Sequence, residues 1–430
     1  MAILLFIFYS LLCGYGIWKI PFFRKSGIHP VLLLLLFGGH VLVGCLHNII
    51  AYRYYPAHGD IWFYFEKGFQ TRHRLRSEFD LFLSDNSTWT YISHNAISFI
   101  QVILDFFSFD NLYINTLLFS FPVFLGNTAL YRLFRRRFPA DPLTALLVFL
   151  LPSTLFWTAC IHREGALYML LGFLLYWLDR LFTPPSLPGA PSPFGRPSLA
   201  AGDARKTIFY AAAAFLLIAY FRASVALTLI PALIAWRLAE SPLPRWWLWV
   251  LAGSVLVIAL LLATPCLSFL TAQQRSFLIL EGHSRLPLPA LDGSWTSLWQ
   301  TLPVAIRNGL FEPLPGSGGQ RIYTAFSVET FLIWGIIALA IVHRLLTRNR
   351  PSPSAETPFS LCCLVFAGLS LLLIGTLVPF AGAIVRYRSI YLPFLLAPFL
   401  HSLRSLPPFR QTDLLLTPFL SDPSHTPNKL

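Results

Sequence analysis

The sequence predicts an all-α integral membrane protein with about eleven transmembrane helices, and three observations favour this class. Of the 430 residues, 56% are hydrophobic and only 12% are charged, whereas soluble domains carry roughly 25% charged residues. The mean hydropathy is +0.63. Apolar stretches of roughly 17–25 residues, the length that crosses a bilayer, recur along the chain. They contain runs without Asp, Glu, Lys or Arg: Ile3–Tyr15, Val31–Val43 and Leu251–Ala263.

The apolar stretches predict one polytopic membrane domain over residues 1–430. The predicted spans are 1–20, 31–51, 113–131, 143–161, 165–182, 207–221, 223–238, 246–265, 327–346, 360–382 and 388–403. The first span lacks a basic leader and a small-residue cleavage site, so we interpret it as a retained helix rather than a signal peptide. The pair at 207–238 is short for two crossings, and one broken or tilted unit is the alternative.

The stretch 92–108 is predicted to lie at the membrane interface. Its polar residues His94, Ser98, Gln101 and Asp105 recur at helical spacing and form one stripe on an otherwise apolar helix. A solvated stripe of this kind is more typical of an interfacial helix than of a spanning one.

Basic residues set the predicted orientation. Most of the 32 Lys and Arg residues fall in alternate loops, on one side of the membrane. By the positive-inside rule that side is cytoplasmic, which places the N-terminus outside and the C-terminus inside. The net charge of +13 therefore reflects topology, and a nucleic-acid partner is not expected.

The loops differ in size and composition. Two large external loops are predicted at 52–112, with its interfacial helix, and at 266–326. The cytoplasmic segment 184–206 begins with a Pro/Gly/Ser-rich linker, and 407–430 is predicted to be a cytoplasmic tail. Within the second external loop, Ala305–Pro313 suggests a structured re-entrant or interfacial element.

Signatures of nucleotide and metal sites are absent from the sequence. We find no Walker A loop, dinucleotide-binding glycine motif, HExxH or Cys/His pattern. The six cysteines show no metal-ligand spacing and suit apolar packing. We assign no residue to a metal, and the sequence leaves open whether a divalent cation takes part in the reaction. An enzyme of this kind that acts on the external face would receive its activated substrate from a membrane carrier.

Asp60 is the first candidate for chemistry. It ends the motif His58-Gly59-Asp60 after the second span, where the glycine permits a tight turn. A carboxylate facing a cavity at the membrane surface could act as a general base towards an acceptor hydroxyl or amine. The alternative is an ordinary solvated loop aspartate.

Two further candidates lie at ends of apolar segments. His162-Arg163-Glu164 stands between two spans with almost no loop, where charges need partners or a wetted cavity. An ordinary interfacial turn with an Arg–Glu contact is the alternative. Arg222 lies between two short apolar segments, where it could hold a phosphate or simply extend to the headgroups.

Arg386-Tyr387-Arg388 opens the last predicted span on the external side. Two arginines there run against the positive-inside rule, so we expect another group to compensate for their charge. Their donors would suit a phosphate or diphosphate leaving group.

The order of these motifs resembles the GT-C superfamily of polytopic glycosyltransferases that use polyprenyl-phosphate-linked sugars. The resemblance rests on His58-Gly59-Asp60, on Phe156-Trp157 with Arg163-Glu164, and on Arg386-Tyr387-Arg388 with Pro393. The chain also resembles bacterial membrane proteins in which Gly-Asp precedes aromatics, here Ile61-Trp62-Phe63-Tyr64. The resemblance implies a GT-C-like fold and a catalytic acid in the first external loop, beside an interfacial helix. In many members the acid follows the first span, whereas Asp60 follows the second.

We therefore expect a membrane glycosyltransferase that moves a sugar from a polyprenyl-phosphate-linked donor to a glycan, lipid or protein acceptor on the external face. Asp60 would be the catalytic base, and Arg386, Arg388 and Arg222 would bind the donor phosphate. The predicted pocket residues are His58, His162, Arg163, Glu164 and Tyr387. The expected location is a bacterial inner membrane, and an endoplasmic reticulum protein with its active face in the lumen is the alternative. A glycan polymerase or ligase, distinguished by product length, and a transporter or flippase of lipid-linked substrates are the alternatives.

Overall fold

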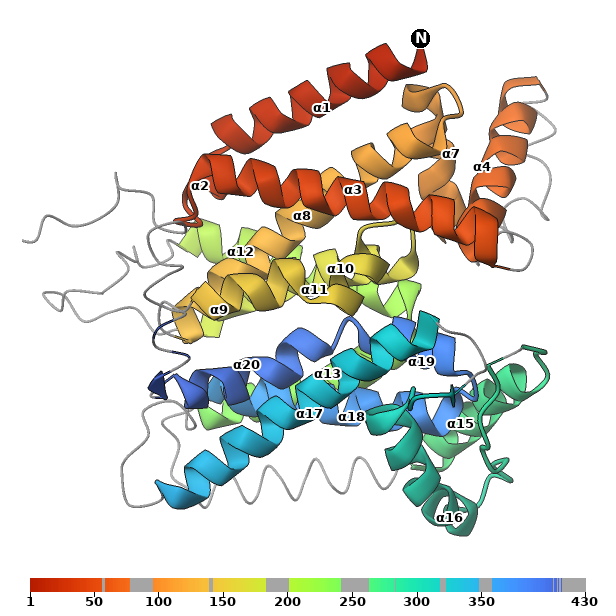
Figure 1. The fold of residues 1–430 in the computed structure, drawn as a ribbon, viewed down its shortest axis with the longest axis vertical. Coiled ribbons are helices and arrows are strands. Elements are labelled where there is room, and N and C mark those ends of the chain that lie inside the picture. The colour runs from red at the N-terminus through yellow and green to blue at the C-terminus, as the bar shows by residue number, and fades with distance from the viewer. Residues whose placement is uncertain are drawn as a thin grey trace, which may run out of the picture. The chain divides into compact units, whose positions relative to one another are not determined.

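The computed structural model of this protein consists, in the residues that it describes, mainly of helices, several of which are joined by turns of a few residues (Figure 1). It describes residues 1–55, 59–77, 96–138, 142–182, 201–240, 263–282, 284–317, 322–347 and 358–404, together with 406, 407, 409 and 411. Within these ranges the chain is all-α and has no strands. It divides into two compact units, Met1–Phe221 with Pro408–Leu430 (unit 1) and Arg222–Pro407 (unit 2).

Unit 1 is built around two buried helices, α8 and α11. The helices described in this unit are α1 (Ala2–Lys19), α2 (Pro21–Arg24), α3 (Pro30–Tyr54), α4 (Gly59–Ser77), α7 (Ala96–Ser108), α8 (Leu112–Arg137), α9 (Pro142–Ala145), the π-helix η2 (Leu146–Leu150), α10 (Pro152–Thr158), α11 (Arg163–Phe182) and α12 (Ala201–Phe221). In the most apolar window of α8, 72% of residues are buried, against 11% in α1. The core of the unit therefore lies along α8, and α1 lies at its periphery.

Close backbone approach explains how α8 and α11 pack side by side (Figure 1). Gly126 of α8 faces Met169 and Gly172 of α11, and a Cβ on either glycine would overlap backbone atoms of the other helix. Small residues at such crossings let helices in a membrane approach closely enough for extensive van der Waals contact.

The polar stripe of α7 is buried rather than solvated. Ser98, Gln101 and Asp105 are each at most 1% exposed, whereas Phe106 and Phe107 on other faces are 47% and 55% exposed. The stripe packs against α4 and α8: Gly68 of α4 faces Gln101, and the Asn115 amide of α8 donates a hydrogen bond of 2.5 Å to Asp105. Buried polar groups need hydrogen-bond partners inside the protein. The helical spacing of these residues therefore reflects a face that packs against protein, not one exposed to water. His94 lies outside the described residues.

One predicted span of unit 1 is interrupted. The stretch 143–161 contains most of α9, which continues directly into the π-helix η2, and then α10. Extended backbone at Leu151 separates η2 from α10. Pro152 begins α10, and a proline disfavours helical backbone at the residue before it. The stretch therefore forms shorter apolar pieces instead of one continuous helix.

Asp179, near the end of α11, is neutralised by two arginines of α8. Its carboxylate lies 2.7 Å from the guanidinium of Arg136 and 2.5 Å from that of Arg137, and its side chain is fully buried. A buried carboxylate is tolerated in an apolar helix when it is paired in this way.

Unit 2 has α18 at its centre. Its described helices are α13 (Ala223–Ala239), α15 (Ala263–Leu278), α16 (Trp295–Ile306), the π-helix η3 (Arg307–Phe311), α17 (Ile322–Leu346), α18 (Pro358–Leu377), α19 (Ala381–Arg388) and α20 (Leu392–Leu403). Gly375 of α18 and Gly309 of η3 allow close contact, because a Cβ on either would overlap backbone of the other element or of Ala305. Residues 305–311 of the predicted element 305–313 are helical, at the end of α16 and in η3, and its re-entrant or interfacial position stays a prediction.

The described residues contain seven helices long and apolar enough to cross a membrane, or eight if α19 and α20, bent by 60°, form one span. The seven are α1, α3, α8, α11, Asp203–Phe221 of α12, Tyr323–Leu346 of α17, and α18. The predicted stretch 223–238 corresponds to α13, which is shorter, and most of 246–265 lies outside the described residues. The chain is a polytopic helical membrane protein.

Candidate functional site

The turn between α10 and α11 brings two metal-binding residue types together. α10 ends at Thr158 and α11 begins at Arg163, so Cys160 and His162 lie in the four-residue connection. The carbonyl oxygen of Cys160 accepts a hydrogen bond of 2.8 Å from the backbone N–H of His162, which tightens the turn. Both side chains are buried, at 0% and 2% exposure.

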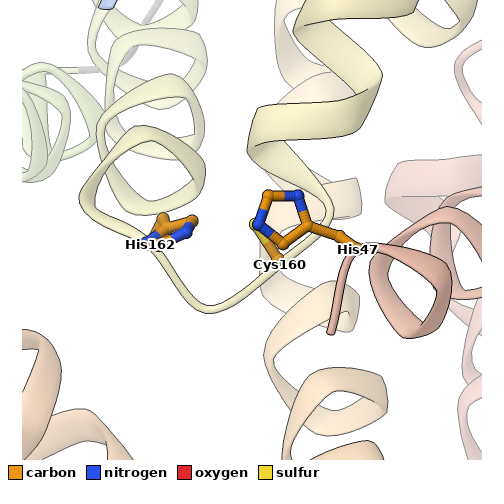
Figure 2. Close-up of side chains that lie close together, drawn as sticks. All are labelled: His47, Cys160 and His162. Carbon is orange, nitrogen blue, oxygen red and sulfur yellow. The ribbon is translucent and has the colours of Figure 1, made fainter. Parts of the chain in front are cut away.

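His47 of α3 completes a cluster with these two residues. One ligand atom from each of His47, Cys160 and His162 lies within 4.8 Å of the others. Figure 2 shows the His47 ring extending from its helix towards Cys160, with His162 across the turn. The two imidazole centroids are 5.4 Å apart and nearly perpendicular.

Aromatic rings surround this cluster. The His47 ring centroid lies 4.4 Å from that of Phe156 and 5.2 Å from that of Trp157, both on α10. Tyr64 of α4 approaches His162 at 6.4 Å. The three ligand-type side chains are therefore held in apolar surroundings, where electrostatic and coordinate interactions are stronger than in water.

Asp60 lies in the first turn of α4 and is exposed. Gly59, which begins the helix, has φ +71°, and a Cβ there would crowd the Tyr55 ring. Only glycine adopts this backbone readily, so the sequence Gly-Asp fixes where the carboxylate emerges. Two residues later, the indole N–H of Trp62 donates a hydrogen bond of 3.1 Å to the carbonyl of Asn48, which follows His47. This bond ties the start of α4 to the part of α3 that carries the cluster.

The predicted pocket residues of unit 1 have different environments. His162 belongs to the cluster, Arg163 is partly exposed, and Glu164 is fully buried in the first turn of α11. A carboxylate at that position interacts favourably with the helix dipole. His58 lies outside the described residues. His47 was not among the predicted site residues, and Cys160 was predicted only to serve apolar packing.

In unit 2, Arg222 and Arg386 both approach the ring of Tyr387. The guanidinium carbon of Arg222 lies 3.8 Å from the ring centroid, and that of Arg386 lies 5.8 Å away. Arg222 sits at the start of α13, while Arg386 and Tyr387 belong to α19. Two positive charges from separate helices are thus gathered around one aromatic ring, an arrangement that favours an anion nearby.

Arg388 has a different position from the other two arginines. Its side chain is buried, at 2% exposure, and it donates hydrogen bonds of 2.6 Å to the carbonyl of Glu312 and to the hydroxyl of Thr330. These bonds join the break between α19 and α20 to the loop after η3 and to α17. They give Arg388 a structural role, and phosphate binding by it stays a prediction.

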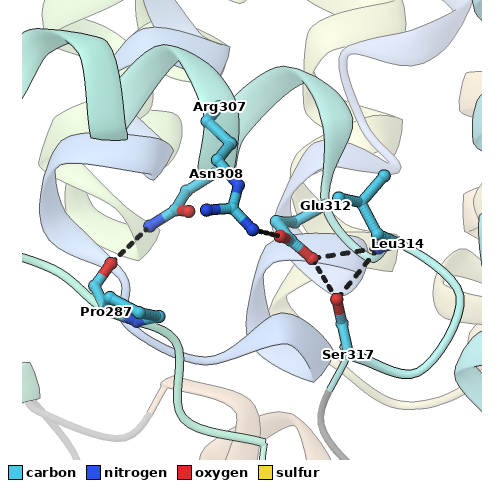
Figure 3. A network of polar contacts seen from close by, with 6 residues as sticks. All are labelled: Pro287, Arg307, Asn308, Glu312, Leu314 and Ser317. Carbon is cyan, nitrogen blue, oxygen red and sulfur yellow. Dashed lines mark hydrogen bonds and ion pairs between the residues drawn. The ribbon is translucent and has the colours of Figure 1, made fainter.

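Glu312 organises the loop that receives Arg388. As Figure 3 shows, its buried carboxylate accepts hydrogen bonds from the Leu314 backbone N–H at 2.9 Å and from the Ser317 hydroxyl at 2.5 Å, and Arg307 lies 3.4 Å away. Asn308 donates a bond of 3.1 Å to the carbonyl of Pro287, which anchors the preceding segment. The loop is therefore a hydrogen-bonded scaffold.

Comparisons with protein-family models, with curated proteins and with solved structures find no significant match to this chain. The class that the fold defines is that of a polytopic helical membrane protein with seven to eight candidate spans in the described residues.

Proposed function

We propose that this protein is a membrane glycosyltransferase that transfers a sugar from a polyprenyl-phosphate-linked donor to an acceptor on the external face of a bacterial inner membrane. The observation that carries the proposal is the pair Arg222 and Arg386 over Tyr387. A phosphate leaving group gains negative charge as the glycosidic bond breaks. Guanidinium groups that are preorganised around the phosphate would stabilise that charge more in the transition state than in the ground state.

Asp60 is proposed as the general base. It is exposed at the start of α4, where an acceptor hydroxyl or amine can reach it. In the proposed reaction the acceptor oxygen or nitrogen bonds to the anomeric carbon as Asp60 takes its proton. The bond from that carbon to the phosphate oxygen breaks with inversion, and the oxygen leaves with its electron pair.

The exposed apolar surface supports a lipid-linked donor. Phe106 and Phe107 of α7, and Leu332 of α17 at 63% exposure, present large apolar side chains outward. An apolar exterior in each unit suits lipid, and a polyprenyl tail would enter from the bilayer between helices. The proposal includes a GT-C-like fold of eleven spans, with the N-terminus outside and the C-terminus in the cytoplasm.

The test is transfer of radiolabelled sugar from polyprenyl-phosphate-linked donors by the purified protein. We expect Asp60→Asn and Arg386→Ala to abolish transfer. Matched controls are Glu66→Gln, an exposed acid on the same helix as Asp60, and Arg344→Ala, an exposed arginine of unit 2. Both controls should retain wild-type transfer. Full activity of Asp60→Asn would refute the base assignment, and absence of transfer from every donor tried would refute the function.

A further inference from the structure

We infer that His47, Cys160 and His162 form a Zn²⁺ site that ties α3 to the turn between α10 and α11. Thiolate and imidazole are the ligands that Zn²⁺ prefers in proteins, and three protein ligands with a fourth position open to water or another ligand is a common arrangement. The three residues come from two separate parts of unit 1, so their convergence is a property of the fold and not of one local motif.

The distances fit such a site after small side-chain rotations. Zn²⁺ bonds at about 2.0–2.1 Å to imidazole nitrogen and about 2.3 Å to thiolate, so tetrahedral ligand atoms lie roughly 3.3–3.8 Å apart. The three atoms here lie within 4.8 Å of one another. Contraction by about an ångström, within the reach of χ rotations of the two histidines, would complete the coordination.

The surroundings are suited to retain a metal with this ligand set. Cys160 belongs to the buried cluster that includes Ile161, Ala51 and Phe119, and all three ligand residues are at most 2% exposed. An apolar shell limits competition by water. The thiolate and imidazole donors select soft or borderline ions over Mg²⁺ or Ca²⁺, which prefer oxygen ligands. On binding, the Cys160 thiol loses its proton to solvent as the sulfur–zinc bond forms, and both imidazoles bind in the neutral form.

The same unit offers matched controls for both residue types. His40 is a buried histidine on α3, at 2% exposure, and Cys13 is a buried cysteine on α1, at 7%. Neither belongs to the cluster. Replacing them removes one imidazole or one thiol from the interior of unit 1 and leaves the proposed ligands intact.

The experiment measures Zn²⁺ bound to the full-length protein in detergent, purified without a histidine tag and stripped with chelator. After incubation with ZnSO₄ and desalting, elemental mass spectrometry should find about one zinc per chain in the wild type, His40→Gln and Cys13→Ser. His47→Gln, Cys160→Ser and His162→Gln should lose at least about 100-fold in affinity, since even outer-shell changes cost 10–100-fold. Absence of zinc from the wild type, or equal zinc in Cys160→Ser, would overturn the inference.

Two further readouts separate ligand loss from misfolding. Co²⁺ in place of Zn²⁺ should give a thiolate-to-cobalt charge-transfer band that persists in Cys13→Ser and disappears in Cys160→Ser. Zn²⁺ should also raise the melting temperature of the wild type and the controls but not that of the cluster variants. A cobalt spectrum without the thiolate band would contradict coordination by Cys160. None of these readouts depends on transferase activity.

Discussion

The guanidinium of Arg222 lies over the ring of Tyr387, 3.8 Å from its centroid. Such cation–π contact holds the planar guanidinium by its face, while hydrogen bonding to anions uses its N–H edges. Arg222 follows the end of α12 and Tyr387 lies in the last turns of α19. The ring of Tyr387 therefore positions an arginine that has extended backbone, with φ −160° and ψ 97°.

Replacement of Tyr387 should separate the roles of its ring and its hydroxyl. Tyr387→Phe keeps the aromatic face, and we expect the KM for the lipid-linked donor to change by less than about twofold. Tyr387→Leu removes the face, and we expect the donor KM to rise by about 5- to 30-fold, which corresponds to about 1–2 kcal/mol. Steady-state kinetics with varied donor measures both. Equal kinetics of the two variants would show that the ring does not position Arg222.

Arg388 should matter for stability more than its neighbour Arg386. Arg388 is buried and donates to Glu312 and Thr330, so Arg388→Met leaves buried acceptors without their donors. Leaving a buried acceptor without its donor costs about 1–3 kcal/mol. We expect a large fall in the melting temperature in detergent, measured by intrinsic fluorescence.

Arg386→Met is the matched comparison for that measurement. Arg386 is partly exposed and lies two residues away on the same helix. Its replacement should change the melting temperature little while impairing donor use. Similar melting temperatures of the two variants would argue against the structural role of Arg388.

The sequence predicts those features of the fold that depend on a single helix. Charge-free runs indicated α1 and α3, and the predicted span 360–382 corresponds to α18, because the length and hydropathy of one segment suffice to identify a span. The third charge-free run, Leu251–Ala263, lies almost entirely outside the described residues. The break at Leu151 was missed, although Pro152 is a local signal for it. Burial of the α7 stripe was missed because spacing shows that polar residues share a face, not whether that face meets water or protein.

The candidate site was less predictable, because it depends on how separate helices pack against one another. Cys160 and His162 are separated by a single residue in the sequence, but His47 joins them only because α3 packs beside α10. No periodic pattern encodes that pairing. Conversely, the sequence grouped three residues as one motif, Arg386-Tyr387-Arg388. In the helix the Arg388 side chain is buried, whereas the Arg386 guanidinium lies near the ring of Tyr387.

A pair of glycines on α18 gives a test of the packing in unit 2. A Cβ at Gly375 would overlap the backbone of Ala305 and Gly309, whereas a Cβ at Gly368, on the same helix, meets nothing within 4 Å. We expect Gly375→Ala to destabilise the protein by about 1–3 kcal/mol or more through overpacking. Gly368→Ala should be neutral or stabilising by up to about 1 kcal/mol, because alanine favours helix. Melting temperatures that fall equally would contradict the tight contact between α18 and η3.

Asp105 should make the stability of unit 1 depend on pH. The pKa of its carboxyl is raised to about 7, mainly because burial disfavours the charged form. The hydrogen bond from Asn115 and the charge of Arg72 lower this pKa, and the charge of Asp110 raises it. The folded state therefore holds a proton that the unfolded chain releases near pH 4. Between pH 4 and pH 7 stability should fall as pH rises, and above pH 7 this contribution should be constant.

Asp105→Asn removes the titrating group while keeping an oxygen that can accept from Asn115. We expect the variant to lose this decline between pH 4 and 7 and to melt at a higher temperature than the wild type at pH 8. Asp292→Asn is the control, because hydrogen bonds from Ser294 and Ser297 lower the pKa of Asp292 to about 2, below the range tested. Its pH profile should follow the wild type. If stability of Asp105→Asn still falls between pH 4 and 7, another group causes the pH dependence. The carboxyl of Asp105 would then be ionised in the folded protein over this range.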